Sequence, residues 1–134
     1  MESCIFCKIV KGEIPAYKVS EDEKNLAFLS ISPIKPGHTL VIPKKHSEYL
    51  FDMEDSELAG LIQFSKPIAQ KLKTALEPKT GKVGVMVAGL EVPHTHIHLI
   101  PMDSEEDLNF ANAKPTAPED LEPILVKIAT LRSQ

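Results

Sequence analysis

Residues 91–101, "EVPHTHIHLIP", hold three of the five histidines of the chain at alternate positions, His94, His96 and His98. Successive side chains of a β-strand point to opposite faces, so residues i, i+2 and i+4 share one face. We therefore expect the three imidazoles to form a row on one face of a strand. The residues between them face the other side.

A row of imidazoles suits two kinds of chemistry. One is a metal ion held by three nitrogens. The other is a nucleophilic imidazole whose neighbours position it and handle protons. A chance row on an exposed strand is the plain alternative, but three of five histidines within five residues make chance a poor explanation. The spacing alone does not decide between metal and nucleophile.

The composition places the chain among ordinary folded domains. Its 134 residues are enough for one domain, residues 1–134, and 43% of them are hydrophobic and 25% charged. A net charge of −4 argues against a nucleic-acid partner. No apolar run approaches the roughly 18 residues of a membrane span, and we find no secretory signal at the N-terminus. With two cysteines three residues apart, Cys4 and Cys7, a reducing cytoplasmic location is expected.

The first half of the chain is rich in strand patterns. Two β-type runs are separated by polar residues, and a Pro36-Gly37 turn precedes a run of consecutive apolar residues. The expected elements are a short helix at 5–11 and strands at 16–22, 25–31 and 38–44.

The second half begins with apolar residues at helical spacing and ends in the same way. Asp52 is a candidate N-cap for the first helix, and "TAPE", Thr116 to Glu119, reads as a capping box for the last. The expected elements are a long helix at 53–76, strands at 82–89 and 94–102 joined by a tight connection, an irregular stretch at 103–117 and a helix at about 116–132. This order predicts an α+β fold with a mainly antiparallel sheet.

Two stretches carry a resemblance to a known family. "PHTHIHLIP" resembles the His-x-His-x-His signature of the histidine triad (HIT) superfamily of nucleotide hydrolases and transferases. Residues 4–46 are similar to the N-terminal half of that family, and the likeness extends to about Met102, closest to the nucleotide-binding, Hint-like branch. The resemblance implies a HIT-like fold whose sheet continues across a homodimer. It also implies a purine nucleotide or nucleotide conjugate as ligand.

The resemblance assigns roles to the histidines. His96 would attack the α-phosphorus of a nucleotide conjugate and form a transient nucleotidyl-imidazole, from which water releases the nucleoside monophosphate. His98 and His38 match positions that line the phosphate pocket, where we expect them to donate hydrogen bonds to phosphate oxygens.

The Cys4-x-x-Cys7 pair has three interpretations. The first is a redox pair, but such a pair usually follows a strand, and the absence of a predicted strand before Cys4 argues against it. Two buried thiols that pack as small hydrophobic groups are a second interpretation. The third is a structural zinc site in which His46 and His94 supply the other two ligands. Some relatives in the superfamily carry a zinc built in this way.

The resemblance also implies a nucleoside pocket, with two departures from the family pattern. Ser30 stands where an aspartate usually accepts both ribose hydroxyls, and Leu90 and Glu91 replace a polar pair before the triad. By strand alternation, Glu91 is expected to point away from the phosphate. The positions that match the pocket are Phe6, Ile9, Phe28, Ile31 and Leu40, with the backbone of Gly89 near the phosphate.

Three functions follow from these patterns. The first is a hydrolase that cleaves nucleoside phosphoramidates or related conjugates through His96. The second is a dinucleoside polyphosphate hydrolase, whose longer anionic substrate calls for more phosphate donors. The third is a zinc-stabilised nucleotide-binding interaction protein with little catalysis, which the departures at Ser30, Leu90 and Glu91 favour.

Overall fold

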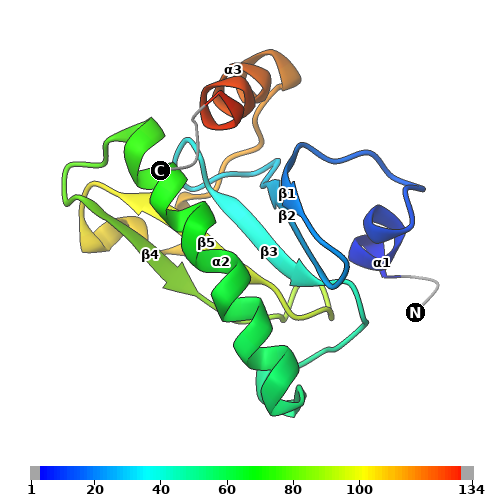
Figure 1. Ribbon diagram of the computed structural model, residues 1–134. Coiled ribbons are helices and arrows are strands. Elements are labelled where there is room, and N and C mark those ends of the chain that lie inside the picture. Colours follow the sequence, from blue (N-terminus) through cyan, green and yellow to red (C-terminus); the bar gives the residue numbers. More distant parts are fainter. Residues whose placement is uncertain (1–3, 131–134) are drawn as a thin grey trace.

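The computed structural model describes residues 4–130, and its centre is one antiparallel sheet (Figure 1). The strand order is β1-β2-β3-β5-β4, and every neighbouring pair is antiparallel. The predicted α+β class with an antiparallel sheet is therefore confirmed. The strands are β1 (Lys18–Glu21), β2 (Asn25–Leu29), β3 (Thr39–Pro43), β4 (Lys82–Met86) and β5 (Ile97–Met102).

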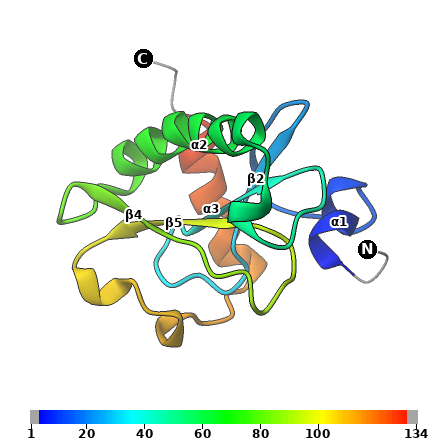
Figure 2. The ribbon, with the colours of Figure 1, turned by 90° about the horizontal axis from the view of Figure 1, so that it is seen from below.

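Helices cover the sheet unequally. The long helix α2 (Asp55–Leu76) lies along one face, and the segment of about residues 103–113 that follows β5 lies on the opposite side (Figure 2). None of the helices in the described part of the chain is long and apolar enough to cross a membrane. The remaining elements are α1 (Ile5–Val10), α3 (Pro118–Ala129) and three 3-10 turns, η1 (Leu50–Asp52), η2 (Glu105–Asp107) and η3 (Phe110–Asn112).

The face under α2 holds the larger core. Side chains of β2, β3 and β5 pack there against α2, and Ile128 of α3 joins them. Burial of this apolar surface is the main favourable term in the stability of the fold. The strand residues in this core are Ala27, Leu29, Val41, Ile97 and Leu99.

The opposite face is covered in part by α1. Leu26, Phe28, Leu40 and Ile42 alternate with the strand residues of the first core, so the two faces follow the period of two expected for strands. They pack against buried residues of α1, including Phe6. The sheet is therefore buried on both sides along β2 and β3.

The turn before β3 depends on glycine. Gly37 has φ +89°, a conformation that side chains rarely adopt. A Cβ at this position would also lie 2.9 Å from the side chain of Leu76. The predicted Pro36-Gly37 turn is confirmed, and it delivers His38 to the start of β3.

Both predicted helix caps are wrong. Asp52 lies in η1, after which the chain is extended, so α2 starts later with Glu54 as N-cap and no side-chain cap. The N–H of Thr116 donates to the carbonyl of Ile31, and this pairing holds Thr116 outside α3. Ala117 is the N-cap and Pro118 the first helical residue.

Other boundaries differ by a few residues. The strand predicted at 82–89 ends at Met86, and the one predicted at 94–102 begins at Ile97. Residues 87–96 thus form a longer loop where a tight connection was expected. The end of the helix predicted at 116–132 falls outside the described residues.

Candidate active site and metal centre

A cavity of about 390 Å³ opens on the α1 side of the sheet. His38, His96 and His98 line it, so the structure brings together the three histidines predicted to act on phosphate. The expected nucleoside positions Phe6, Ile9, Phe28, Ser30, Ile31 and Leu40 also line this cavity, and Gly89 does not.

Strand register explains why His98 points into this cavity. His98 of β5 pairs with Leu40 of β3, and directly opposed residues share a face. Leu40 belongs to the core under α1, whereas the neighbouring pair of Val41 with Ile97 belongs to the core under α2. Strand alternation therefore places the histidine on the cavity side.

Hydrogen bonds define which nitrogens of His38 and His98 carry protons. The N–H of Ile34 donates to Nδ1 of His38 at 3.0 Å, so the proton of a neutral His38 is on Nε2. That Nε2 lies 2.9 Å from Nδ1 of His98 and donates to it. His98 consequently carries its own proton on Nε2, which makes it a hydrogen-bond donor.

His96 has the opposite tautomer. Its Nδ1 lies 2.7 Å from the carbonyl oxygen of His94, an acceptor, so Nδ1 carries the proton. The lone pair is then on Nε2. The ring lies 4.7 Å from that of His98 and 5.1 Å from that of Phe6, measured between centroids. One imidazole with a free lone pair thus stands beside one that donates.

Burial keeps these rings uncharged at neutral pH. Burial and the neighbouring His96 lower the pKa of His38 to about 4. Burial, with His96 and His38 nearby, lowers the pKa of His98 to about 3. Burial also lowers the pKa of His96, although the hydrogen bond to His94 and the Glu91 carboxylate act in the other direction. A neutral imidazole is the form that can act as a nucleophile.

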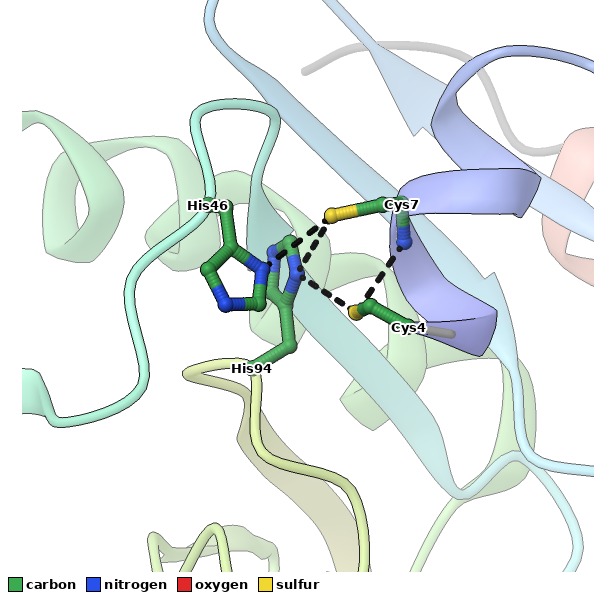
Figure 3. Close-up of side chains that lie close together, drawn as sticks. All are labelled: Cys4, Cys7, His46 and His94. Atoms are coloured by element: carbon green, nitrogen blue, oxygen red, sulfur yellow. Dashed lines mark hydrogen bonds between the residues drawn. The ribbon is translucent and has the colours of Figure 1, made fainter. Parts of the chain in front are cut away.

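Beside the cavity, four potential metal ligands converge (Figure 3). Cys4 and Cys7 come from the start of α1, His46 from the loop after β3, and His94 from the loop before β5. Their ligand atoms all lie within 4.8 Å of one another. The structure thus brings together the four residues predicted to bind zinc.

The donor set fits a tetrahedral zinc ion. Nδ1 of His94 lies 3.3 Å from the sulfur of Cys4 and 3.5 Å from that of Cys7, and Nδ1 of His46 lies 3.1 Å from the Cys7 sulfur. With Zn–S near 2.3 Å and Zn–N near 2.0–2.1 Å, tetrahedral donors lie about 3.3–3.8 Å apart.

The surroundings of the two histidines also suit a metal. Nε2 of His94 lies 2.8 Å from the carbonyl oxygen of Pro43 and donates to it, which leaves the Nδ1 lone pair directed at the sulfurs. Nε2 of His46 lies 3.6 Å from the Glu48 carboxylate. Burial, helped by Cys4, raises the pKa of the Cys7 thiol, a cost that a bound cation would offset.

Glu91, which strand alternation predicted to point away from the phosphate, is among the residues that line the cavity. It lines the same cavity as His96, and its carboxylate acts to raise the pKa of that ring. The reason is local, because residues 91–93 are in a loop and have no strand alternation. Leu90, the other departure, is 89% exposed and does not line the cavity.

Phe110 lines the cavity beside His98, a position that was not predicted. The ring of Phe110 in η3 lies 4.9 Å from that of His98, edge to face, and is 45% exposed. Two backbone hydrogen bonds, from Lys114 to Pro33 and from Thr116 to Ile31, hold this segment beside the cavity. The sequence around Phe110 has no periodic pattern that would have indicated this position.

Comparison with known proteins identifies the family. A family model described as the HIT domain matches residues 11–105. The adenosine 5'-monophosphoramidase of Schizosaccharomyces pombe is 41% identical over 107 residues, which cover 78% of this chain and 77% of the yeast protein. The chain therefore belongs to the HIT family.

Solved structures agree with this assignment. A HIT-like protein from Bartonella henselae has a TM-score of 0.82 and 34% identity, with 96% of each chain covered. A zinc-bound histidine triad family protein from Mycobacterium smegmatis has a TM-score of 0.76 and 31% identity, covering 96% of this chain and 94% of that one. The predicted HIT-like fold is thus confirmed.

Proposed function

We propose that this HIT protein is a nucleotide hydrolase that cleaves nucleoside phosphoramidates, or related purine nucleotide conjugates, to the nucleoside monophosphate. The observation that carries the proposal is the pair of opposite tautomers at His96 and His98 in a cavity lined mostly by apolar residues. The 41% identity to a protein named adenosine 5'-monophosphoramidase supports the choice of substrate.

The first step uses Nε2 of His96 as nucleophile. Its lone pair attacks the α-phosphorus, the P–N bond to the leaving amine breaks, and the amine takes up a proton from solvent water as it departs. The hydrogen bond from Nδ1 to the His94 carbonyl stabilises the positive charge that develops on the ring. The Nε2–H of His98 donates to a phosphate oxygen, and His38 holds His98 in that tautomer.

The second step returns the enzyme to its starting state. Water attacks the phosphorus, the bond to Nε2 of His96 breaks, and the nucleoside monophosphate leaves with the oxygen from water. Each displacement thereby has an imidazole either as nucleophile or as leaving group. The apolar residues of the cavity, including Phe6 and Ile31, would hold the base.

The metal centre has a structural role in this proposal. A zinc ion would be held by Cys4, Cys7, His46 and His94. The bound ion would crosslink three segments of the chain. His94 also supplies the carbonyl that orients His96, so the centre and the nucleophile share one residue. Free thiols suited to zinc agree with a reducing cytoplasmic location.

We also propose a homodimer in which the sheet continues across the interface. Strand β4 is at the edge of the sheet, where its outer backbone groups have no strand partner among the described residues. Val85 on this strand and Val87 just after it are 56% and 38% exposed. An apolar edge strand of this kind favours pairing with a second copy.

The decisive experiment is steady-state hydrolysis of a fluorogenic adenosine phosphoramidate by the wild type and by His96→Ala. We expect turnover by the wild type and a loss of at least about a thousandfold in the variant, since no other group in the cavity is placed to replace this nucleophile. Circular dichroism and adenosine monophosphate binding should be retained. Binding without turnover in the wild type would instead support a nucleotide-binding interaction protein.

A further inference from the structure

The cavity has an unusual charge for a site that accepts phosphate. Among the described residues that line it, Glu91 is the one charged side chain, and neither lysine nor arginine is present. His38 and His98 are neutral because the Nδ1 of each accepts a hydrogen bond, and the ring of His96 is buried. The cavity therefore carries a net negative charge.

The backbone holds Glu91 beside the nucleophile. Its neighbour Val92 packs against the core under α1, and the Val92 carbonyl accepts a hydrogen bond from the N–H of His94 at 2.8 Å. Glu91 is exposed and forms no ion pair with any described residue, so no side chain in the described part of the chain neutralises its carboxylate.

The sign of this charge matters for the group attached to the α-phosphorus. A polyphosphate would add several negative charges within the same cavity, and Coulomb repulsion from Glu91 would oppose its binding. An amine leaving group adds none, and an ammonium on that group would be attracted. The exposed ring of Phe110, next to His98, offers a face on which such a cation can lie.

We propose that Glu91 is a specificity-determining residue that selects substrates with a neutral or cationic amine leaving group and rejects nucleoside polyphosphates. This inference rests on the proposed function, because it concerns the leaving group of that reaction. It assigns to Glu91 a role in binding and none in bond making or breaking.

The kinetic test uses three adenosine phosphoramidates whose amine carries an ammonium, an uncharged amide or a carboxylate at the same distance. For the wild type, kcat/KM should fall in that order. Glu91→Gln should lower the ratio of kcat/KM for the ammonium substrate to kcat/KM for the carboxylate substrate by about three- to tenfold, as expected for partly screened charges. Glu91→Lys should invert the order of the three kcat/KM values. Glu122→Gln is the control, since this exposed glutamate of α3 does not line the cavity.

A binding test separates this inference from the proposed function. Titration calorimetry would give the affinities of adenosine mono- and diphosphate, whose extra phosphate occupies the place of the leaving group. The wild type should prefer the monophosphate, and Glu91→Lys should reverse that preference while Glu122→Gln retains it. Absence of hydrolysis with this pattern intact would reject only the hydrolase. If neither Glu91 variant changes the kcat/KM ratios between substrates or the affinity ratio between mono- and diphosphate, the role of Glu91 is overturned.

Discussion

Nε2 of His38 lies 2.9 Å from Nδ1 of His98, and the Nδ1 of the same His38 accepts the N–H of Ile34. This chain of two hydrogen bonds starts at the backbone and ends at the imidazole that faces the cavity. A histidine at the start of β3 thereby decides which nitrogen of a histidine in β5 carries the proton. The relationship leads to the first prediction.

Replacing His38 by alanine should release His98 from one tautomer. We expect kcat to fall about ten- to a hundredfold, and stability to fall by about 1–3 kcal/mol because the buried N–H of Ile34 loses its acceptor. Nitrogen-15 NMR of labelled histidines would report the tautomer of His98 directly. A His98 signal that stays in the Nε2–H form would contradict the relay.

The pH dependence of stability should reflect the buried neutral histidines. His38 and His98 have pKa values near 4 and 3 in the folded chain, against about 6.5 when unfolded. Between these values the unfolded state binds more protons, so stability is greatest above pH 6.5 and falls as the pH decreases toward 4. The slope should be about 1.4 kcal/mol per pH unit for each histidine.

Urea unfolding at pH 5 and pH 6, both between the folded and unfolded pKa values, measures this slope. The Cys4→Ser background should be used, so that loss of metal at low pH does not contribute. Adding His98→Asn removes one titrating group, and the slope should then decrease by the share of that one histidine. If the free energy of unfolding changes with pH equally with and without His98, then this histidine does not contribute to the pH dependence and the prediction is wrong.

The metal centre predicts that replacing one ligand lowers the zinc content of the protein. Metal-replete wild type should contain about one zinc ion per chain, and Cys4→Ser should lose it, because one of four ligands is removed. The melting temperature should fall as well, since the ion ties α1 to the loops before β5 and after β3. Elemental analysis that finds the same metal content in Cys4→Ser would exclude this centre.

Ser30 predicts weak recognition of the ribose. Its hydroxyl lines the cavity but already accepts the N–H of Ser32 at 3.2 Å. A carboxylate accepts two hydroxyls at once, and charged hydrogen bonds contribute about 1.5–3 kcal/mol. Ser30→Asp should therefore tighten binding of adenosine monophosphate by about tenfold.

The deoxy nucleotide is the control for this prediction. It lacks one of the two hydroxyls, so the gain from Ser30→Asp should be smaller, as measured by titration calorimetry. Equal gains for both nucleotides would refute recognition of the hydroxyls.

Pairing of β4 edges predicts the oligomeric state. Light scattering should show a dimer at micromolar concentration, and Val85→Asp should shift it toward monomer by burying a charge in the interface. Val126→Asp is the matched control, because this valine is similarly exposed, at 59%, and belongs to α3, which contacts α2 and β1, the strand at the opposite edge from β4. Monomer alone in the wild type would reject the proposed dimer.

Periodic patterns explain which parts of the fold could be predicted. Alternation around His96 and His98 placed them on one face, and the register of β5 with β3 bears this out for His98. Consecutive apolar residues in β3 and helical spacing in α2 gave the correct elements. Such patterns are local, and burial of one face depends directly on them. Helix caps failed because tertiary pairing, as at Thr116, displaced the helix start.

The sequence by itself therefore determined the alternating histidines, the order of the elements and the family to which they point. Only the tertiary structure decided that Glu91 lines the cavity and that the ring of Phe110 packs against His98. Both residues lie in irregular segments, where no repeating pattern sets the direction of a side chain. Their positions follow from contacts between segments far apart in the chain, and these contacts exist only once the sheet and its two cores have formed.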